Sequence, residues 1–146
     1  KVQKKVPDAL LVLIGRLSNW TLMSILSLGL KVVNYPNCQQ IQYFYNAADV
    51  FVSTSYYEGF GLPLLEAMAS CCPIVASNSS SIPEVVGTAG ILLDPFDVEG
   101  FAYWIRKILT DEDTAFKLAM EGERRSKLFD WRRCAEETIR VYKEVI

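Results

Sequence analysis

Short apolar runs alternate along this chain with longer segments in which apolar residues recur at helical spacing. Each short run has the length and composition of a strand that is buried on both faces. These runs predict strands at 9–14, 31–33, 49–54, 73–77 and 90–93. The longer segments predict helices at 20–28, 41–48, 64–70, 98–109, 114–128 and 132–146. Repeated strand–helix units of this size predict an α/β fold, with a doubly wound parallel sheet that helices cover on both faces.

Polar residues mark where helices begin in the second half of the chain. Asp97 stands where an N-cap residue belongs, and Thr110 with Asp113 has the spacing of an acidic capping box. In the last helix, apolar residues fall near one face while charged residues can face water. We expect ordinary core packing, rather than a partner-binding stripe, for the apolar face formed by Ala135, Ile139, Tyr142 and Ile146.

Composition narrows the class of protein. The 146 residues are enough for one domain, and the 51% that are hydrophobic can form a core, which excludes a wholly disordered chain. The net charge of −2 creates no basic field for nucleic acid or anionic lipid. The run at 9–14 is too short to cross a bilayer, and the residues before it lack a signal-peptide pattern. We expect neither a membrane span nor a secreted mini-protein.

Histidine is absent, which excludes His-dependent catalytic triads and removes most zinc and haem sites. The four cysteines, Cys38, Cys71, Cys72 and Cys134, form no C-x-x-C pair. We expect them to be small buried hydrophobic residues in a reducing compartment. Neither a metal site nor a cofactor is expected.

Residues that can carry chemistry gather in the segment 56–67, which follows the third predicted strand. Gly59 and Gly61 permit a close approach of the backbone to a ligand, and Pro63 suits the first position of a helix. The N-terminus of that helix is an anion site at the carboxyl end of a strand, where ligands bind in open parallel sheets. Glu58 and Glu66 flank the turn, and such carboxylates accept hydrogen bonds from a vicinal diol. This arrangement predicts a sugar or nucleotide site, although a purely structural turn, with Glu66 as favourable helix charge, fits the same residues.

Four blocks of sequence, 48–52, 58–69, 73–77 and 82–87, are recognisable together. In this order they resemble the carboxy-terminal, donor-nucleotide domain of glycogen-synthase-like retaining glycosyltransferases, which are two-domain enzymes of the GT-B architecture (glycosyltransferase family 4-like, group 1). The E-x7-E element from Glu58 to Glu66 is the specific part, and the resemblance covers nearly the whole chain.

The resemblance implies a role for each matching residue. Glu66 would bind the ribose hydroxyls of a nucleotide-diphosphate sugar, and Glu58, the candidate catalytic residue, would contact the donor sugar. Backbone amides would line the sugar at Gly59, Phe60, Gly61 and Leu62 and face the diphosphate at Leu64 and Leu65. The loop around Tyr35 and Pro36 would hold the base through backbone groups, and Gly15 would lie near the nucleotide. Turn chemistry accounts equally well for Gly15 and Pro36.

The resemblance also implies that residues 1–146 are the donor-binding domain of a larger enzyme. We expect the domain to lack its first strand and the basic pair that faces the diphosphate, and its partner to be an amino-terminal acceptor domain. Cys71-Cys72 and Ser79-Ser80-Ser81 depart from the family pattern, which has glycine in both places.

The implied reaction passes a hexosyl unit to an acceptor hydroxyl with retention of configuration, without a metal. A non-catalytic sugar- or nucleotide-binding module, a nucleotide-sugar epimerase and a phosphorylase are the alternatives. The expected location is the cytoplasm, with peripheral attachment to the cytoplasmic face of a membrane and self-association through exposed sheet edges left open. No nucleic-acid partner is expected.

Overall fold

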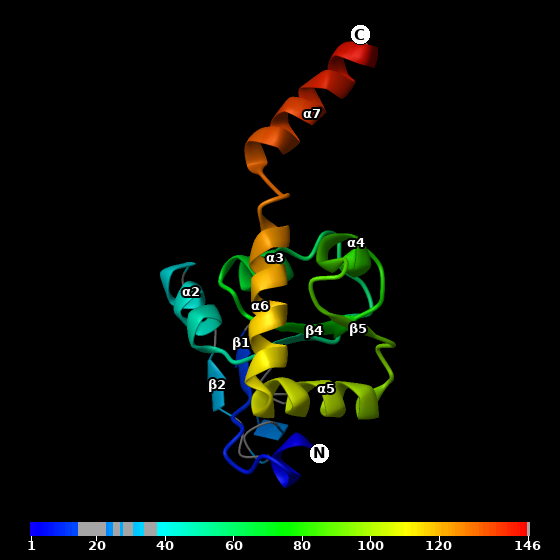
Figure 1. Ribbon diagram of the computed structural model, residues 1–146. Helices are drawn as coiled ribbons and strands as arrows, with labels where there is room; N and C mark the ends of the chain where they lie inside the picture. The colour runs from blue at the N-terminus through cyan, green and yellow to red at the C-terminus, as the bar shows by residue number, and fades with distance from the viewer. Residues whose placement is uncertain (15–22, 25–26, 28–30, 34–37, 146) are drawn as a thin grey trace.

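The computed structural model describes residues 1–14, 23–24, 27, 31–33 and 38–145 (Figure 1). Its described strands pair in parallel. β1 (Val12–Ile14) pairs with β2 (Lys31–Val33), while β3 (Phe51–Ser53), β4 (Ile74–Ser77) and β5 (Ile91–Leu93) form a second sheet in the order β3-β4-β5. Each strand lies inside the range predicted for it, so the parallel α/β architecture is confirmed.

Helices connect and cover these strands. They are α2 (Cys38–Ala47), α3 (Leu62–Ala69), α4 (Ile82–Val86), α5 (Val98–Thr110), α6 (Glu112–Ser126) and α7 (Trp131–Val145), with a 3-10 helix, η1 (Val2–Lys4), near the N-terminus. All except η1 and α4 correspond to predicted helices. Sequence reasoning missed α4 because its five residues, which include Pro83, are too few to show helical periodicity. Most of the helix predicted at 20–28 lies outside the described residues.

β4 lies at the centre of the core, and all four of its residues are fully buried. Ile74 and Ala76 belong to the cluster formed with α3 and α4, which includes the fully buried Met68. Val75 instead packs with Phe101 of α5. Successive side chains of a strand point to opposite faces, so this division places α3 and α4 on one side of the sheet and α5 on the other (Figure 1). The predicted cover of helices on both faces is confirmed.

The two predicted helix caps have different outcomes. Asp97 caps α5 as predicted, because its carboxylate accepts a hydrogen bond from the N–H of Gly100 at 2.9 Å. The capping box predicted for Thr110 and Asp113 is wrong, because the N-cap of α6 is Asp111. Thr110 is the last residue of α5, and its hydroxyl donates back within that helix.

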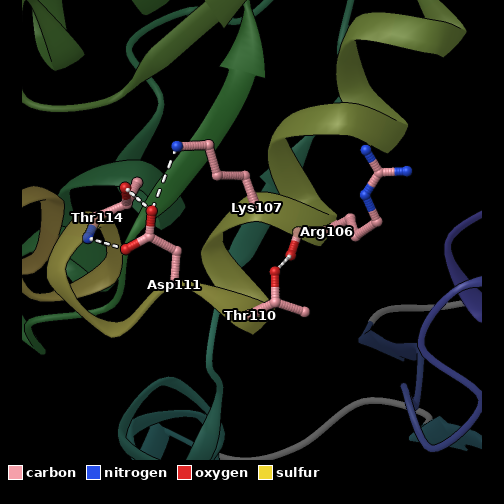
Figure 2. A network of polar contacts seen from close by, with 5 residues as sticks. All are labelled: Arg106, Lys107, Thr110, Asp111 and Thr114. Atoms are coloured by element: carbon pink, nitrogen blue, oxygen red, sulfur yellow. Dashed lines mark hydrogen bonds and ion pairs between the residues drawn. The ribbon is translucent and has the colours of Figure 1, made fainter.

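Figure 2 shows the contacts that join α5 to α6. The Asp111 carboxylate accepts from the N–H of Thr114 at 3.0 Å and from the Thr114 hydroxyl at 2.9 Å. Lys107 of α5 forms an ion pair with the same carboxylate at 3.2 Å. These contacts, above all the bond from the Thr114 N–H, hold the pKa of Asp111 below its ordinary value. The Asp111 side chain therefore links the last turn of α5 to the first turn of α6.

α7 extends away from the body of the molecule (Figure 1), and none of its residues is buried. The core packing predicted for its apolar face is therefore wrong: Ile139 is 51% exposed and Tyr142 is 61% exposed. Ala135 is exposed as well, and Ile146 lies outside the described residues. Neither α7 nor any other helix in the described part of the chain is long and apolar enough to cross a membrane.

The prediction that the cysteines are buried is confirmed only for Cys72. Burial, with a smaller contribution from Asp49, raises the pKa of the Cys72 thiol to about 12. Cys71 and Cys134 are exposed free thiols, so the prediction is wrong for both. Cys71 occupies the turn after α3, where it has a φ of 55°, and Cys134 lies on the exposed α7. The side chain of Cys38 lies outside the described part.

Candidate functional site

The segment that carries the two glutamates connects β3 to α3 at the carboxyl end of the strand. Residues 54–61 form the β3–α3 loop, and α3 begins at Leu62. Gly61 is the N-cap of α3 with a φ of 97°, and a Cβ atom there would lie 2.9 Å from Cδ1 of Leu64. The backbone angle therefore favours glycine, and a Cβ atom would in addition displace the end of the Leu64 side chain. Pro63 is the second residue of α3, one position later than predicted.

Serine hydroxyls from β4 and the β4–α4 connection bind the carbonyls of this loop. The donors are Ser77, Ser79, Ser80 and Ser81, and the acceptors are the carbonyls of Ser55, Tyr56, Glu58 and Phe60. The Glu58 carbonyl accepts twice, from Ser80 at 2.7 Å and from Ser81 at 3.0 Å. We call these four hydroxyls the serine clamp. Sequence reasoning noted the serines only as a departure from glycine, although a run of serines directly after a buried strand was the available signal.

The N–H groups at the end of the loop differ from its carbonyls. In the described part of the chain, the N–H groups of Gly59, Phe60, Gly61 and Leu62 donate to no protein oxygen. The N–H groups of Leu64 and Leu65, in contrast, both donate to the Gly61 carbonyl, at 3.0 and 3.4 Å. Four consecutive donors without a protein acceptor, next to the positive end of a helix, favour an anion or a hydroxyl-rich ligand.

Glu66 lies on the exposed surface of α3, and Tyr45 of α2 holds its carboxylate. The Tyr45 hydroxyl donates to Oε2 of Glu66 at 2.9 Å. The tyrosine is only 5% exposed, and its ring packs edge-on against Phe51 with the ring centroids 5.7 Å apart. Burial, followed by the hydrogen bond to Glu66, raises the pKa of Tyr45, so its proton stays on the hydroxyl. Nothing in the sequence pattern pointed to this pair, which joins residues 21 positions apart.

Glu58 differs from Glu66 in how it is held. Its residue is half-buried, and the clamp fixes its backbone through the carbonyl. Within the described residues its side chain makes no hydrogen bond or ion pair. The carboxylate is therefore attached to a fixed backbone while its oxygens remain available for a ligand.

Arg125 of α6 anchors the helix that follows the clamp. Its Nε and Nη2 atoms donate to the carbonyls of Val85 and Glu84, both at 2.6 Å, at the C-terminal end of α4. A Cβ atom on Gly87, whose φ is 54°, would lie 2.5 Å from the guanidinium carbon. Cationic groups are favourable at the C-terminus of a helix, so Arg125 ties α4 to α6.

A groove of about 670 Å³ lies beside the loop. Phe60, Leu62 and Leu65 line it together with residues of the segment that follows α6 and of α7, among them Phe129 and Trp131. The rings of Phe60 and Phe129 meet edge-on, with centroids 5.8 Å apart. The tip of the β3–α3 loop therefore contacts the segment that joins α6 to α7.

The structure brings most of the sequence-predicted site residues together. Glu58, Gly59, Phe60, Gly61, Leu62, Leu64, Leu65 and Glu66 all lie in the β3–α3 loop and the first turns of α3. Gly15, Tyr35 and Pro36 lie outside the described residues. Among the residues that are described, no cluster of three or more His, Cys, Asp or Glu side chains could hold a metal ion.

Comparison with known proteins gives a consistent result. Residues 1–125 match the family described as glycosyl transferases group 1. O-antigen chain mannosyltransferase B of Escherichia coli is 41% identical over 114 residues, which are 78% of this chain and 30% of that protein.

Solved structures share the fold. Sucrose-phosphate synthase of Thermosynechococcus elongatus superposes with a TM-score of 0.85 at 29% identity, over 99% of this chain and 40% of that one. HepE of Anabaena, solved with UDP-glucose, superposes with a TM-score of 0.81 at 21% identity, over 94% of this chain and 42% of that one. The chain thus spans less than half the length of these proteins. By its sequence and its GT-B-type fold, this chain belongs to the group 1 glycosyl transferases.

Proposed function

We propose that this chain binds a nucleotide-diphosphate sugar at the β3–α3 loop and, as the donor-binding domain of a larger enzyme, transfers the hexosyl unit to an acceptor hydroxyl with retention of configuration. One observation carries the proposal. Serine hydroxyls occupy the carbonyls of Ser55, Tyr56, Glu58 and Phe60, whereas the four consecutive N–H groups of residues 59–62 donate to no protein oxygen among the described residues. Donors that are fixed before the ligand arrives are suited to stabilise a diphosphate leaving group.

The nucleotide side of the proposal rests on α3. The free N–H groups of Gly61 and Leu62 and the positive end of the helix dipole bind the diphosphate. Glu66 accepts hydrogen bonds from the ribose hydroxyls, and Tyr45 holds the carboxylate in position for them. The Leu64 and Leu65 N–H groups contribute indirectly, since their bonds to Gly61 shape the start of the helix. HepE, which shares this fold, was solved with UDP and with UDP-glucose.

The sugar side of the proposal rests on Glu58. Its carboxylate has no partner in the described part of the chain and follows directly on the clamped backbone. We assign it contacts to the donor-sugar hydroxyls that strengthen as the glycosidic bond breaks, with the N–H groups of Gly59 and Phe60 lining the same sugar. The acceptor then enters from an amino-terminal domain. The resemblance supports retention, and the relatives named mannosyltransferases support a hexose as the transferred sugar.

Two substitutions in the full-length enzyme test these roles. Glu66→Gln removes charge-assisted hydrogen bonds to the ribose, each worth about 1.5–3 kcal/mol, so we expect nucleoside-diphosphate affinity to fall at least tenfold. Glu58→Ala should lower kcat and leave nucleoside-diphosphate affinity unchanged, because its contacts are to the sugar. Calorimetric titration with UDP, GDP and their glucose and mannose derivatives measures binding, and radiolabel transfer measures turnover.

Glu144→Gln is the matched control, since Glu144 is an exposed carboxylate on α7. It should change neither binding nor transfer. Wild-type affinity in Glu66→Gln would eliminate the ribose role. A wild-type protein that binds nucleotide sugars tightly but transfers nothing to any acceptor would instead support a non-catalytic binding module.

A further inference from the structure

Resting on the function proposed above, we propose that Ser80 and Ser81 are positioning residues for sugar transfer, whose hydroxyls hold the backbone of Glu58 so that its carboxylate meets the donor sugar. The nucleotide does not depend on Ser80, whose hydroxyl donates only to the Glu58 carbonyl. Ser81 also donates to the Phe60 carbonyl and so holds the peptide group that carries the Gly61 N–H. Ser80 therefore acts on the sugar side of the site, and Ser81 acts on both sides.

The hydrogen bonds converge on one short stretch of backbone. The carbonyl of Glu58 accepts from Ser80 at 2.7 Å and from Ser81 at 3.0 Å, and Ser81 also donates to the Phe60 carbonyl at 3.1 Å. Gly59, between the two acceptors, has no heavy atom within 4 Å of the position of a Cβ and supplies no packing of its own. Without the two hydroxyls, the Glu58 carbonyl would lose both of its hydrogen bonds, and the nearest remaining clamp contact would be that of Ser79 to the Tyr56 carbonyl.

Ser80 adopts a backbone conformation that disfavours serine. Its φ is 55°, and only two non-glycine residues in the described part of the chain have a positive φ. Glycine would take this angle without steric cost. A serine here keeps a strained backbone and contributes a hydroxyl that glycine lacks. Strain that persists at a binding loop is typical of a functional constraint.

Ser81 is in the right place to cap α4 but does not do so. It is the N-cap residue of that helix, and its side chain makes no capping hydrogen bond. A serine at this position normally accepts from the N–H groups of the first turn. Its hydroxyl instead donates to the Glu58 and Phe60 carbonyls. The helix gives up one stabilising contact, and the loop gains two.

The base of the clamp is rigid enough to position the loop. The serines extend from β4, whose residues are fully buried, and lead into α4, which Arg125 fastens to α6. The Glu58 backbone is thereby connected, through Ser80 and Ser81, to the buried core of the domain rather than to another surface loop.

The test uses the full-length enzyme and five variants. In Ser80→Ala, we expect kcat to fall while nucleoside-diphosphate affinity changes less than twofold. In the double variant Ser80→Ala/Ser81→Ala, we expect kcat to fall at least tenfold. Ser80→Gly relieves the backbone strain but removes the hydroxyl, so kcat should fall as far as in Ser80→Ala without a loss of thermal stability. Ser81→Thr keeps a hydroxyl and should retain turnover. Ser126→Ala is the control, because the Ser126 hydroxyl also donates to a carbonyl, that of Glu123, away from the loop.

Amide hydrogen exchange provides a readout independent of activity. We expect the amides of Gly59 to Leu62 to exchange faster in the double variant, and those of β4 to remain unchanged. Wild-type kcat in the double variant, full turnover in Ser80→Gly, or unchanged exchange in the loop would each overturn the proposal. A wild-type enzyme that transfers no sugar would overturn the proposed function, whereas transfer that is unaffected by the serines would overturn only the positioning role.

Discussion

Replacing Tyr45 with phenylalanine should weaken nucleotide binding without disrupting the fold. The change removes one hydroxyl, and the ring can keep its edge-on contact with Phe51 at 5.7 Å. What is lost is the hydrogen bond of 2.9 Å to Oε2 of Glu66. After that loss the carboxylate is free to rotate, and binding must then fix it as well as the ligand.

The magnitude follows from the exposure of the two partners. A hydrogen bond to a charged group contributes about 1.5–3 kcal/mol, but Glu66 is exposed and water replaces the lost donor. We therefore expect a loss of about 1 kcal/mol in folding stability. For nucleoside-diphosphate binding we expect a loss of about 1–1.4 kcal/mol, which is a five- to tenfold increase in Kd.

Calorimetric titration of the full-length enzyme with UDP and GDP measures this effect. Tyr43→Phe is the matched control, because Tyr43 lies on the same helix and is 70% exposed. It should bind as the wild type does. If Tyr45→Phe also bound like the wild type while Glu66→Gln lost affinity, Glu66 would not need to be oriented and this reasoning would be refuted.

The raised pKa of Tyr45 adds a second readout. Burial and the bond to Glu66 place it above the ordinary value of 10.0, so the folded state holds this proton more tightly than the unfolded state does. The corresponding stability is fully present below pH 10.0 and is lost as pH rises towards the folded-state pKa. Alkaline unfolding should therefore be less steep in Tyr45→Phe than in the wild type.

Three further predictions concern the scaffold. Met68→Ala should cost about 2–5 kcal/mol in the free energy of unfolding, measured by urea denaturation, because Met68 is fully buried, whereas Met120→Ala, at 45% exposure, should cost far less. Gly87→Ala should lower the free energy of unfolding by about 1–2 kcal/mol, because alanine disfavours the positive φ of this position. The new Cβ atom should also displace the Arg125 guanidinium, and a crystal structure with the guanidinium unmoved would contradict this. The pKa of Asp111 is lowered in the folded state, so the ionised carboxylate stabilises the fold above pH 3.8, and this stabilisation is lost as pH falls through the folded-state pKa. Acid unfolding should therefore be less steep in Asp111→Asn than in the wild type.

The sequence pattern predicted strands that are buried on both faces. It failed where the burial of a helix face or the choice of a capping residue depends on which other residues lie beside it. The residues of β4 are buried on both faces, so a continuous apolar run was sufficient evidence for it. The pattern of α7 predicts an apolar face whether or not another element covers that face, and here Ile139 is left 51% exposed. The boundaries of α6 shifted because two neighbouring residues, Thr110 and Asp111, both have capping side chains, and the carboxylate of Asp111 is the one that caps.

In the candidate site, too, the residues close together in the sequence were predictable and the long-range contacts were not. Glycines, a proline and two glutamates within nine positions encode the β3–α3 loop locally, so their spacing was informative. The serine clamp and the Tyr45–Glu66 bond join residues 21–23 positions apart, and they exist because α2, α3 and β4 come together in the folded domain. No local pattern specifies such contacts, and only the run of serines after β4 marked one of them.

The serine clamp also bears on how the specificity of such a domain can change during evolution. Its hydrogen bonds go to main-chain carbonyls, which every amino acid possesses, so these bonds do not depend on which side chains the loop carries at the bonded positions. Tyr57, for example, is 81% exposed, and the clamp makes no use of its ring. Under the proposed function, mutations at such a position would alter what the sugar encounters while the N–H groups of residues 59–62 stay in place. A lineage of such domains would then be able to change its donor one substitution at a time and keep its means of binding a diphosphate.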